Sequence, residues 1–377
     1  GNRSRRTGYS PAPAPAETIA GRGPPRGRFR TAPSGWPATR VAHPAAPCGG
    51  PDGPAVLDRV GRVRRRLLGA SGLRVSALGL GTATWGAGTD RDEAALILSD
   101  FVDAGGSLVD ATPIHAASNG SRVADEMLGS ILRRQGLRGE VVLSAASGVD
   151  PAQPVGRRVD CSRRALQADL DSLLSRLGVD HVDVWSPGYW DQSTPPEEVA
   201  DALEFAVRSG RVRYVGLRGY TGWQVAVTHA AAGRIRPVAA QHEYSLLQRG
   251  PEQELLPACA HLGVGFIAGA PLAQGVLTGK YRESIPEDSR GASEHADAEV
   301  QDYLDPHGVN VVGALCTAAE GLGVSPPAAA LSWTRDRPGV TSVLMGARTR
   351  SQLRELLDAE HVALPKAICD ALDDVSL

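Results

Sequence analysis

The chain has 377 residues, of which 42% are hydrophobic and 22% are charged, a composition typical of globular proteins. It contains no apolar run of about eighteen residues, so we expect neither a transmembrane helix nor a membrane partner. The 40 basic and 42 acidic residues give a net charge of -2, which provides no electrostatic reason to expect nucleic acid. The five cysteines lack the spacing of zinc ligands or of a disulfide framework, so we expect no metal site and a reduced, cytoplasmic protein.

Residues 1–59 differ from the rest, because they are rich in proline, arginine and glycine and show no sustained hydrophobic period. Such a segment buries too little apolar surface to offset its chain entropy, so it is predicted to be a disordered tail. Its composition is equally that of GC-rich upstream DNA read as coding sequence. The folded domain is therefore predicted to occupy residues 60–377.

From residue 60 onward, short apolar runs alternate with segments whose apolar residues recur at helical spacing. The predicted strands are 75–81, 107–111, 141–146, 181–186, 213–218, 237–244, 264–270 and 341–347. The predicted helices are 92–105, 122–135, 162–178, 196–210, 223–232, 251–263, 309–323 and 351–360. This alternation favours an α/β fold of the (β/α)8 TIM-barrel type over a doubly wound sheet, since the GxGxxG fingerprint is absent. Functional residues are then expected at the C-terminal ends of the strands.

Three long segments carry a resemblance to a known family: residues 67–86 (LLGASGLRVSALGLGTATWG), 241–281 (beginning QHEYSLLQRGPEQELLP) and 343–357 (VLMGARTRSQLRELL). They resemble the aldo-keto reductase family, and in particular its bacterial branch that is also similar to potassium-channel β subunits. The resemblance implies a TIM barrel, NADPH bound in an extended form at the C-terminal face, and reduction of aldehydes or ketones by hydride transfer.

The catalytic positions of that family are largely substituted. Its members carry an Asp, a general-acid Tyr, a Lys after the third strand and a His after the fourth; here these positions read Asp110, His115, Ala146 and Gly188. Hydride transfer to a carbonyl builds oxyanion charge that the phenol protonates, with Lys and His tuning it. The remaining catalytic candidates are Asp110, which could equally be structural, and His115, whose imidazole can donate a proton near neutral pH. A surface-loop histidine is the commoner interpretation of His115.

The resemblance also implies a cofactor site that is altered at one end. Arg218 and Gly219 stand where similar chains hold the nicotinamide carboxamide with Ser-Asn, Gln241 remains as a carboxamide partner, and Gly269 replaces a stacking aromatic. Arg218 could bind an anionic ligand, fill the vacated nicotinamide space, or pair elsewhere.

The phosphate end of the implied NADP(H) site matches the family motif better than the nicotinamide end does. An arginine at position 348 suits a 2′-phosphate and favours NADP over NAD. Leu356 stands where an adenine-binding Asn is usual. The cofactor-binding candidates, besides Gln241, are Gly81, Thr82, Leu272, Gly275, Leu277, Gly279, Lys280, Arg348, Gln352 and Glu355.

Two functions remain open. In the first, carbonyl reduction is impaired or lost and the protein is a ligand- or partner-binding barrel; in the second, it is an active NADPH-dependent oxidoreductase of aldehydes or ketones that uses Asp110 and His115. We favour the first, because relaxed catalytic demand would remove the catalytic set and the nicotinamide contacts together. The expected partner is a small-molecule ligand or carbonyl substrate, with a protein partner as a further option. The loop from about residue 274 to 308 is expected to fold over the cofactor side.

Overall fold

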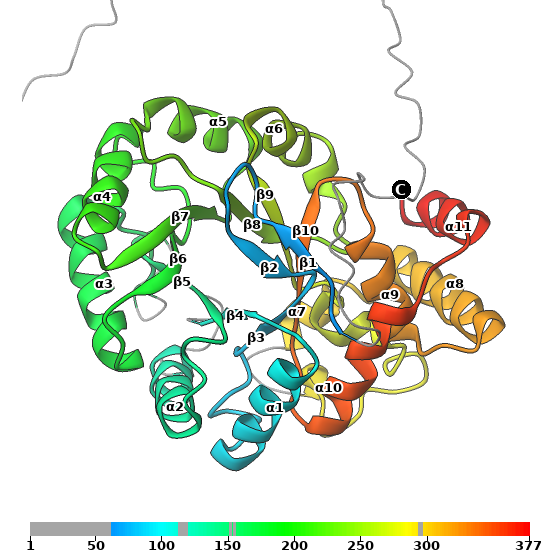
Figure 1. Ribbon diagram of the computed structural model, residues 1–377. Helices are drawn as coiled ribbons and strands as arrows, with labels where there is room; N and C mark the ends of the chain where they lie inside the picture. The colour runs from blue at the N-terminus through cyan, green and yellow to red at the C-terminus, as the bar shows by residue number, and fades with distance from the viewer. Residues whose placement is uncertain (1–61, 112–119, 151–152, 154–155, 293–296) are drawn as a thin grey trace, which may run out of the picture. The chain divides into compact units, whose positions relative to one another are not determined.

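The computed structural model describes residues 62–111, 120–150, 153, 156–292 and 297–377. Eight parallel strands form a closed barrel with helices around it, which confirms the predicted TIM-barrel fold (Figure 1). In barrel order the strands are β3 (Leu78–Gly81), β4 (Leu108–Asp110), β5 (Val142–Ser147), β6 (Val182–Pro187), β7 (Val212–Arg218), β8 (Ala239–Glu243), β9 (Gly265–Gly269) and β10 (Val340–Met345). Strand β10 pairs with both β9 and β3 and so closes the barrel.

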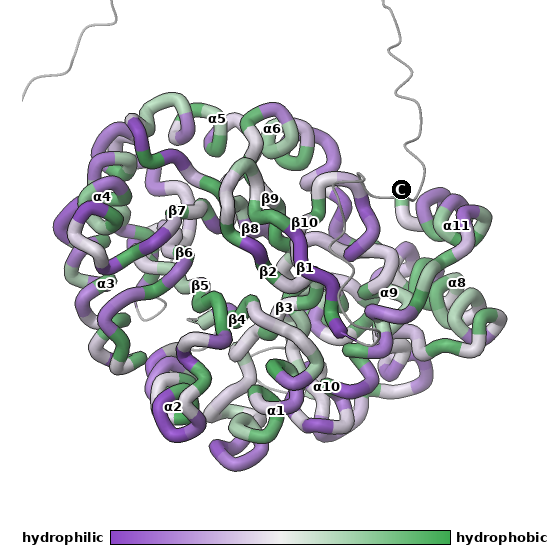
Figure 2. The backbone as a smooth tube through the Cα atoms, viewed as in Figure 1, coloured by the Kyte–Doolittle hydropathy of each residue, from purple (hydrophilic) through white to green (hydrophobic). Residues whose placement is uncertain are grey.

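Helices on the outside of the barrel follow the strands and bury one apolar face each, while most strands are apolar (Figure 2). Helix α3 is a clear example: the Ser162 hydroxyl caps its first turn by accepting from the Ala165 N–H, and Gly178 ends it in a left-handed conformation. These helices are α1 (Arg91–Asp103), α2 (Gly120–Gln135), α3 (Arg163–Leu177), α4 (Pro196–Arg208), α5 (Gly222–Ala231), α6 (Leu255–Leu262), α9 (Pro326–Arg335) and α10 (Arg350–Leu357).

A hairpin closes the N-terminal mouth of the barrel. Strands β1 (Arg65–Leu67) and β2 (Arg74–Ser76) pair antiparallel, and an Arg66 Nη1 donates to the Val340 carbonyl at the start of β10, 2.9 Å away. The single strand predicted over 75–81 is therefore wrong, since it comprises the end of β2 and the whole of β3. The hairpin residues Leu68 and Val75 pack against apolar residues of the barrel strands, so the hairpin covers this end of the barrel.

The connection between β9 and β10 departs from the prediction. The helix predicted near 309–323 is α8 (Pro306–Leu322), but the helix that packs on β10 is α9, which the prediction missed and which is buried from Pro327 to Arg335. Helix α8 packs outside it (Figure 1). Among the described residues no single helix is long and apolar enough to cross a membrane; α8 and α9 reach that length and composition only as a pair bent by 100°. The shorter elements are α7 (Asp297–Gln301) and the 3-10 turns η1 (Gly250–Glu252), η2 (Ala273–Thr278), η3 (Arg290–Ala292) and η4 (Asp358–His361).

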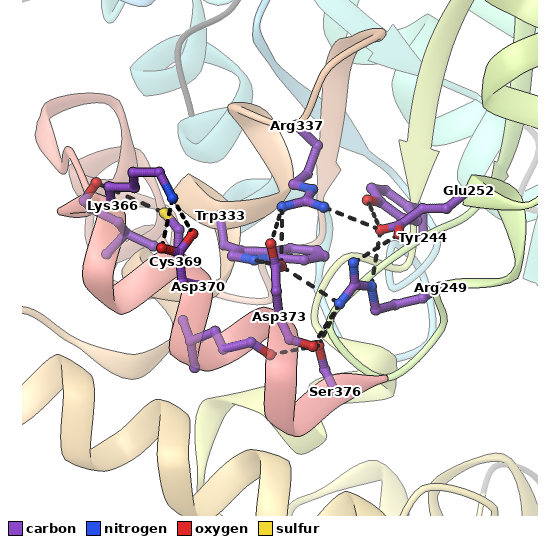
Figure 3. Close-up of polar contacts among 12 residues, drawn as sticks. Tyr244, Arg249, Glu252, Trp333, Arg337, Lys366, Cys369, Asp370, Asp373 and Ser376 are labelled. Atoms are coloured by element: carbon purple, nitrogen blue, oxygen red, sulfur yellow. Dashed lines mark hydrogen bonds and ion pairs between the residues drawn. The ribbon is translucent and has the colours of Figure 1, made fainter. Parts of the chain in front are cut away.

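The C-terminal helix α11 (Lys366–Ser376) is held to the barrel by a network of charged and aromatic side chains (Figure 3). The guanidinium carbons of Arg249 and Arg337 lie 5.3 and 4.7 Å from the centre of the Trp333 ring. The Trp333 indole donates to Asp373 over 3.0 Å, and Asp373 also accepts from Arg337 over 2.8 Å. Glu252 accepts from Arg249 over 2.7 Å, so that one network joins α11, α9 and the loop after β8.

Candidate functional site in the C-terminal mouth

A buried ion pair crosses the C-terminal end of the barrel. Asp110 is the last residue of β4 and Arg218 the last of β7, and only 8% and 6% of these residues are exposed. An Arg218 Nη2 contacts the Asp110 Oδ1 directly. The other carboxylate oxygen accepts from the Gln241 amide over 3.3 Å. Asp110 therefore has a cationic partner, Arg218, within the barrel.

The electrostatics of this pair explain why it holds together. Burial raises the pKa of the Asp110 carboxyl, while the Arg218 charge and hydrogen bonds from Gln241 and Ser144 oppose that rise. Removing one partner of a buried pair leaves an uncompensated charge and costs about 3–5 kcal/mol. The Asp110 carboxylate therefore stays paired with Arg218 unless another cation replaces the guanidinium.

Two positions that the family resemblance predicts to be catalytic lie between the strands of the ion pair. Strands β5 and β6 lie between β4 and β7, and Ala146 and Gly188 lie at the ends of these two strands. Ala146 is in register with Ser186, and the Gly188 N–H donates to the Ser147 carbonyl over 2.8 Å. Neither position has a side chain beyond Cβ, so neither can offer a polar side-chain group to the ion pair. His115 lies outside the described residues, and its role stays a prediction.

Gly81 and Thr82 end β3 next to Asp110. Gly81 is in register with Asp110, and the Thr82 N–H and hydroxyl both donate to the Asp110 carbonyl, over 3.2 and 3.0 Å. These contacts hold the main chain of Asp110 in place. In the structure both cofactor candidates therefore contact the backbone of Asp110.

The loop after β9 is the most strained part of the described chain. Within the described residues, the non-glycine residues with left-handed φ are Ala270, Ala273 and Gln274, with φ of 44°, 45° and 56°, and Gly275 follows with 94°. Such conformations cost about 1–3 kcal/mol each and cluster at ligand sites. Within this loop the Leu277 side chain is buried and the Leu272 side chain is half-buried, so the packing of these two candidates anchors the loop.

Three cationic side chains gather around that loop. Gly275 lies beside Lys280, because a Cβ at Gly275 would meet the Lys280 Nζ at 3.3 Å. Arg290 donates to the Gln274 amide oxygen. Burial lowers the pKa of the Arg290 guanidinium, the charges of Glu299 and Tyr281 oppose that shift, and the charge of Arg348 adds to it. Cationic side chains beside a strained backbone turn form an arrangement that can hold a phosphate.

Arg348 is oriented by its neighbours at the end of β10. Its backbone N–H donates to the Gln352 side chain over 2.9 Å, and its Nη1 donates to the Asp288 carbonyl over 2.7 Å. Gln352 thus supports Arg348, while Glu355 lies exposed on α10 and Leu356 is buried in the core. The sequence prediction did not include Arg290, because Arg290 lies in a loop without a hydrophobic period. The Ser-Arg-Gly sequence at 289–291 is the feature that could have indicated it.

The loop between β9 and α8 lies against the strand ends on this side. The Tyr303 hydroxyl donates to Glu243 at the end of β8 over 2.6 Å, and the Asp288 carbonyl accepts from Arg348 after β10. Its described residues therefore contact the chain at the C-terminal ends of β8 and β10. That the segment 274–308 folds over a cofactor stays a prediction.

The nicotinamide end contrasts with the phosphate end. Gln241, the remaining carboxamide candidate, donates to Asp110, and Arg218 contacts the same carboxylate. Gly269 offers no ring, and a Cβ built there would meet only the His242 carbonyl, at 3.5 Å, and other atoms no closer. The described residues therefore fit the phosphates of a dinucleotide but do not fit its nicotinamide.

Sequence comparison identifies the family of the chain. A family model described as the aldo/keto reductase family matches residues 77–376. The chain belongs to the aldo/keto reductase family. It is 33% identical over 317 residues to the uncharacterized oxidoreductase YrpG of Bacillus subtilis, which covers 82% of this chain and 94% of that protein.

Two further relatives carry different descriptions. The L-glyceraldehyde 3-phosphate reductase of Escherichia coli K12 is 36% identical over 311 residues, covering 80% of this chain and 89% of that protein. A probable voltage-gated potassium channel subunit beta of Arabidopsis thaliana is 33% identical over 317 residues, covering 82% and 95%. This aldo/keto reductase-family chain therefore has oxidoreductases and a channel subunit among its relatives.

Proposed function

We propose that the C-terminal mouth binds NADP(H) through its phosphate-bearing end, and that the protein is a ligand- or partner-binding barrel in which standard carbonyl reduction is impaired. The observation that carries the proposal is the buried pair between Asp110 and Arg218. The pair engages the Asp110 carboxylate, which the family resemblance places in catalysis, and the Gln241 amide contacts the same carboxylate.

The cationic cluster supports NADP(H) as the ligand. Arg348, Arg290 and Lys280 surround a backbone turn with left-handed residues at 273–275. Guanidinium groups bind phosphates through paired, charge-assisted hydrogen bonds. In this proposal these residues would hold the phosphates of the cofactor.

The alternative is an active oxidoreductase that uses Asp110 and His115. It would require the Asp110 carboxylate to assist the imidazole, and the commitment of that carboxylate to Arg218 counts against it. The names of the relatives support aldehydes as substrates in this alternative and a protein partner in the main proposal.

Replacement of Arg348 tests the ligand. We expect Arg348→Ala to weaken NADPH binding about tenfold to a hundredfold and NADH binding about twofold at most, because only NADPH has the 2′-phosphate. Isothermal titration calorimetry measures both. Arg354→Ala is the matched control, since Arg354 lies on α10 shortly after Arg348, has a side chain 65% exposed and pairs with Asp100.

Equal weakening of NADPH and NADH would refute the role of Arg348 at a 2′-phosphate. A reduction of aldehydes by NADPH that is lost in His115→Ala would establish the alternative instead.

A further inference from the structure

The position that the family resemblance predicts for a nicotinamide lies at the ion pair between Asp110 and Arg218. The Arg218 guanidinium on β7 contacts Asp110 on β4, and in barrel order β5 and β6 lie between these two strands. Both charged residues are almost fully buried. The barrel mouth therefore contains an ion pair formed by the protein's own residues.

The groups that would orient a carboxamide are engaged in this pair. Gln241 is in register with Arg218 across β7 and β8, and both side chains contact the same carboxylate. A carboxamide could recruit either group only by withdrawing a partner from a buried anion.

The position that would cover the nicotinamide ring is open. Gly269 has no side chain, and its ideal Cβ position is clear of close contacts, so the glycine there is not required by packing. Next to the floor, Gly219 has a φ of 67°, and a Cβ on it would clash with the Tyr189 ring. The Tyr189 ring thus packs on the backbone directly after Arg218.

From this contrast between the two ends we infer that the mouth recognises a 2′-phosphorylated adenosine diphosphate group without recognising a nicotinamide. The ligand class is nucleotides that carry a 2′-phosphate and a pyrophosphate, such as 2′-phospho-ADP-ribose as well as NADPH. The inference rests on the proposed function and deepens it, because it states which part of the dinucleotide contributes to binding.

The test compares ligands that differ in one group. The wild-type protein is titrated by calorimetry with NADPH, 2′-phospho-ADP-ribose and ADP-ribose. We expect NADPH and 2′-phospho-ADP-ribose to bind within about threefold of each other, and ADP-ribose about tenfold or more weakly for lack of the 2′-phosphate. If NADPH binds at least about tenfold tighter than 2′-phospho-ADP-ribose, the nicotinamide is recognised and the inference is overturned. Failure of all three to bind would overturn the proposed function itself.

A double variant tests whether the ion pair excludes the nicotinamide. Asp110→Asn with Arg218→Ser removes both charges together, and circular dichroism checks that the barrel still folds. We expect NADPH to gain about fivefold or more in affinity while 2′-phospho-ADP-ribose changes by about twofold at most. An unchanged ratio between the two ligands would contradict the role given to Arg218.

Discussion

At the scale of residues, the structure shows that Asp110 and Arg218 form an ion pair with each other. The sequence left Asp110 open between catalysis and structure, and left Arg218 open between an anionic ligand, the vacated nicotinamide space and a pair elsewhere. The two side chains are 108 positions apart in the chain and meet only because β4 and β7 close into one barrel. Their pairing was therefore beyond prediction from either local segment.

The ion pair makes a prediction about stability. Arg218→Met should lower the free energy of unfolding by about 3–5 kcal/mol, because it leaves the Asp110 carboxylate buried without its cation. The double variant with Asp110→Asn should recover most of that loss, since no buried charge remains. Urea denaturation of the two single variants and the double variant measures the coupling. Additive losses would mean that the two side chains do not interact.

At the scale of elements, one network of side chains joins α11 to α9 and to the loop after β8. Asp373 accepts from Trp333 and Arg337, whereas Asp370 on the same helix pairs with Lys366 at the surface, with 53% of its side chain exposed (Figure 3). The two aspartates therefore form a matched pair of test positions.

Asp373→Ala should lower the free energy of unfolding by about 2–3 kcal/mol, because Arg337 and the Trp333 indole lose their acceptor. Asp370→Ala should change it by less than about 1 kcal/mol, as is usual for an exposed ion pair. Thermal and urea denaturation compare the two variants. Similar losses for both would show that the network contributes no more than a surface contact.

The elements also show why some predictions failed. Helix α9 is buried on almost every side, so its sequence lacks the amphipathic period that revealed the other helices. The hairpin strands β1 and β2 have three residues each, too few for an alternating pattern to be distinguished from β3. The eight barrel strands were predicted because parallel strands buried on both faces form continuous apolar runs.

At the scale of the whole molecule, the TIM barrel and its family could be predicted from residue 60 onward, and the family model confirms the family over residues 77–376. The predicted tail, residues 1–59, and His115 lie outside the described residues, and these predictions stay untested. Within the site, Arg348 and the turn at 275–280 came from local motifs. The contact of Arg290 with Gln274 joins residues 16 positions apart, and the pair between Arg218 and Asp110 joins residues 108 positions apart; both became visible only in the structure.

The most direct test of the whole account is a crystal structure of the protein grown with NADPH. We predict an ordered adenosine 2′-phosphate and pyrophosphate at Lys280, Arg290 and Arg348, with Arg218 still on Asp110 and no fixed position for the nicotinamide. A nicotinamide ordered over Gly269, with Arg218 displaced from Asp110, would contradict the account.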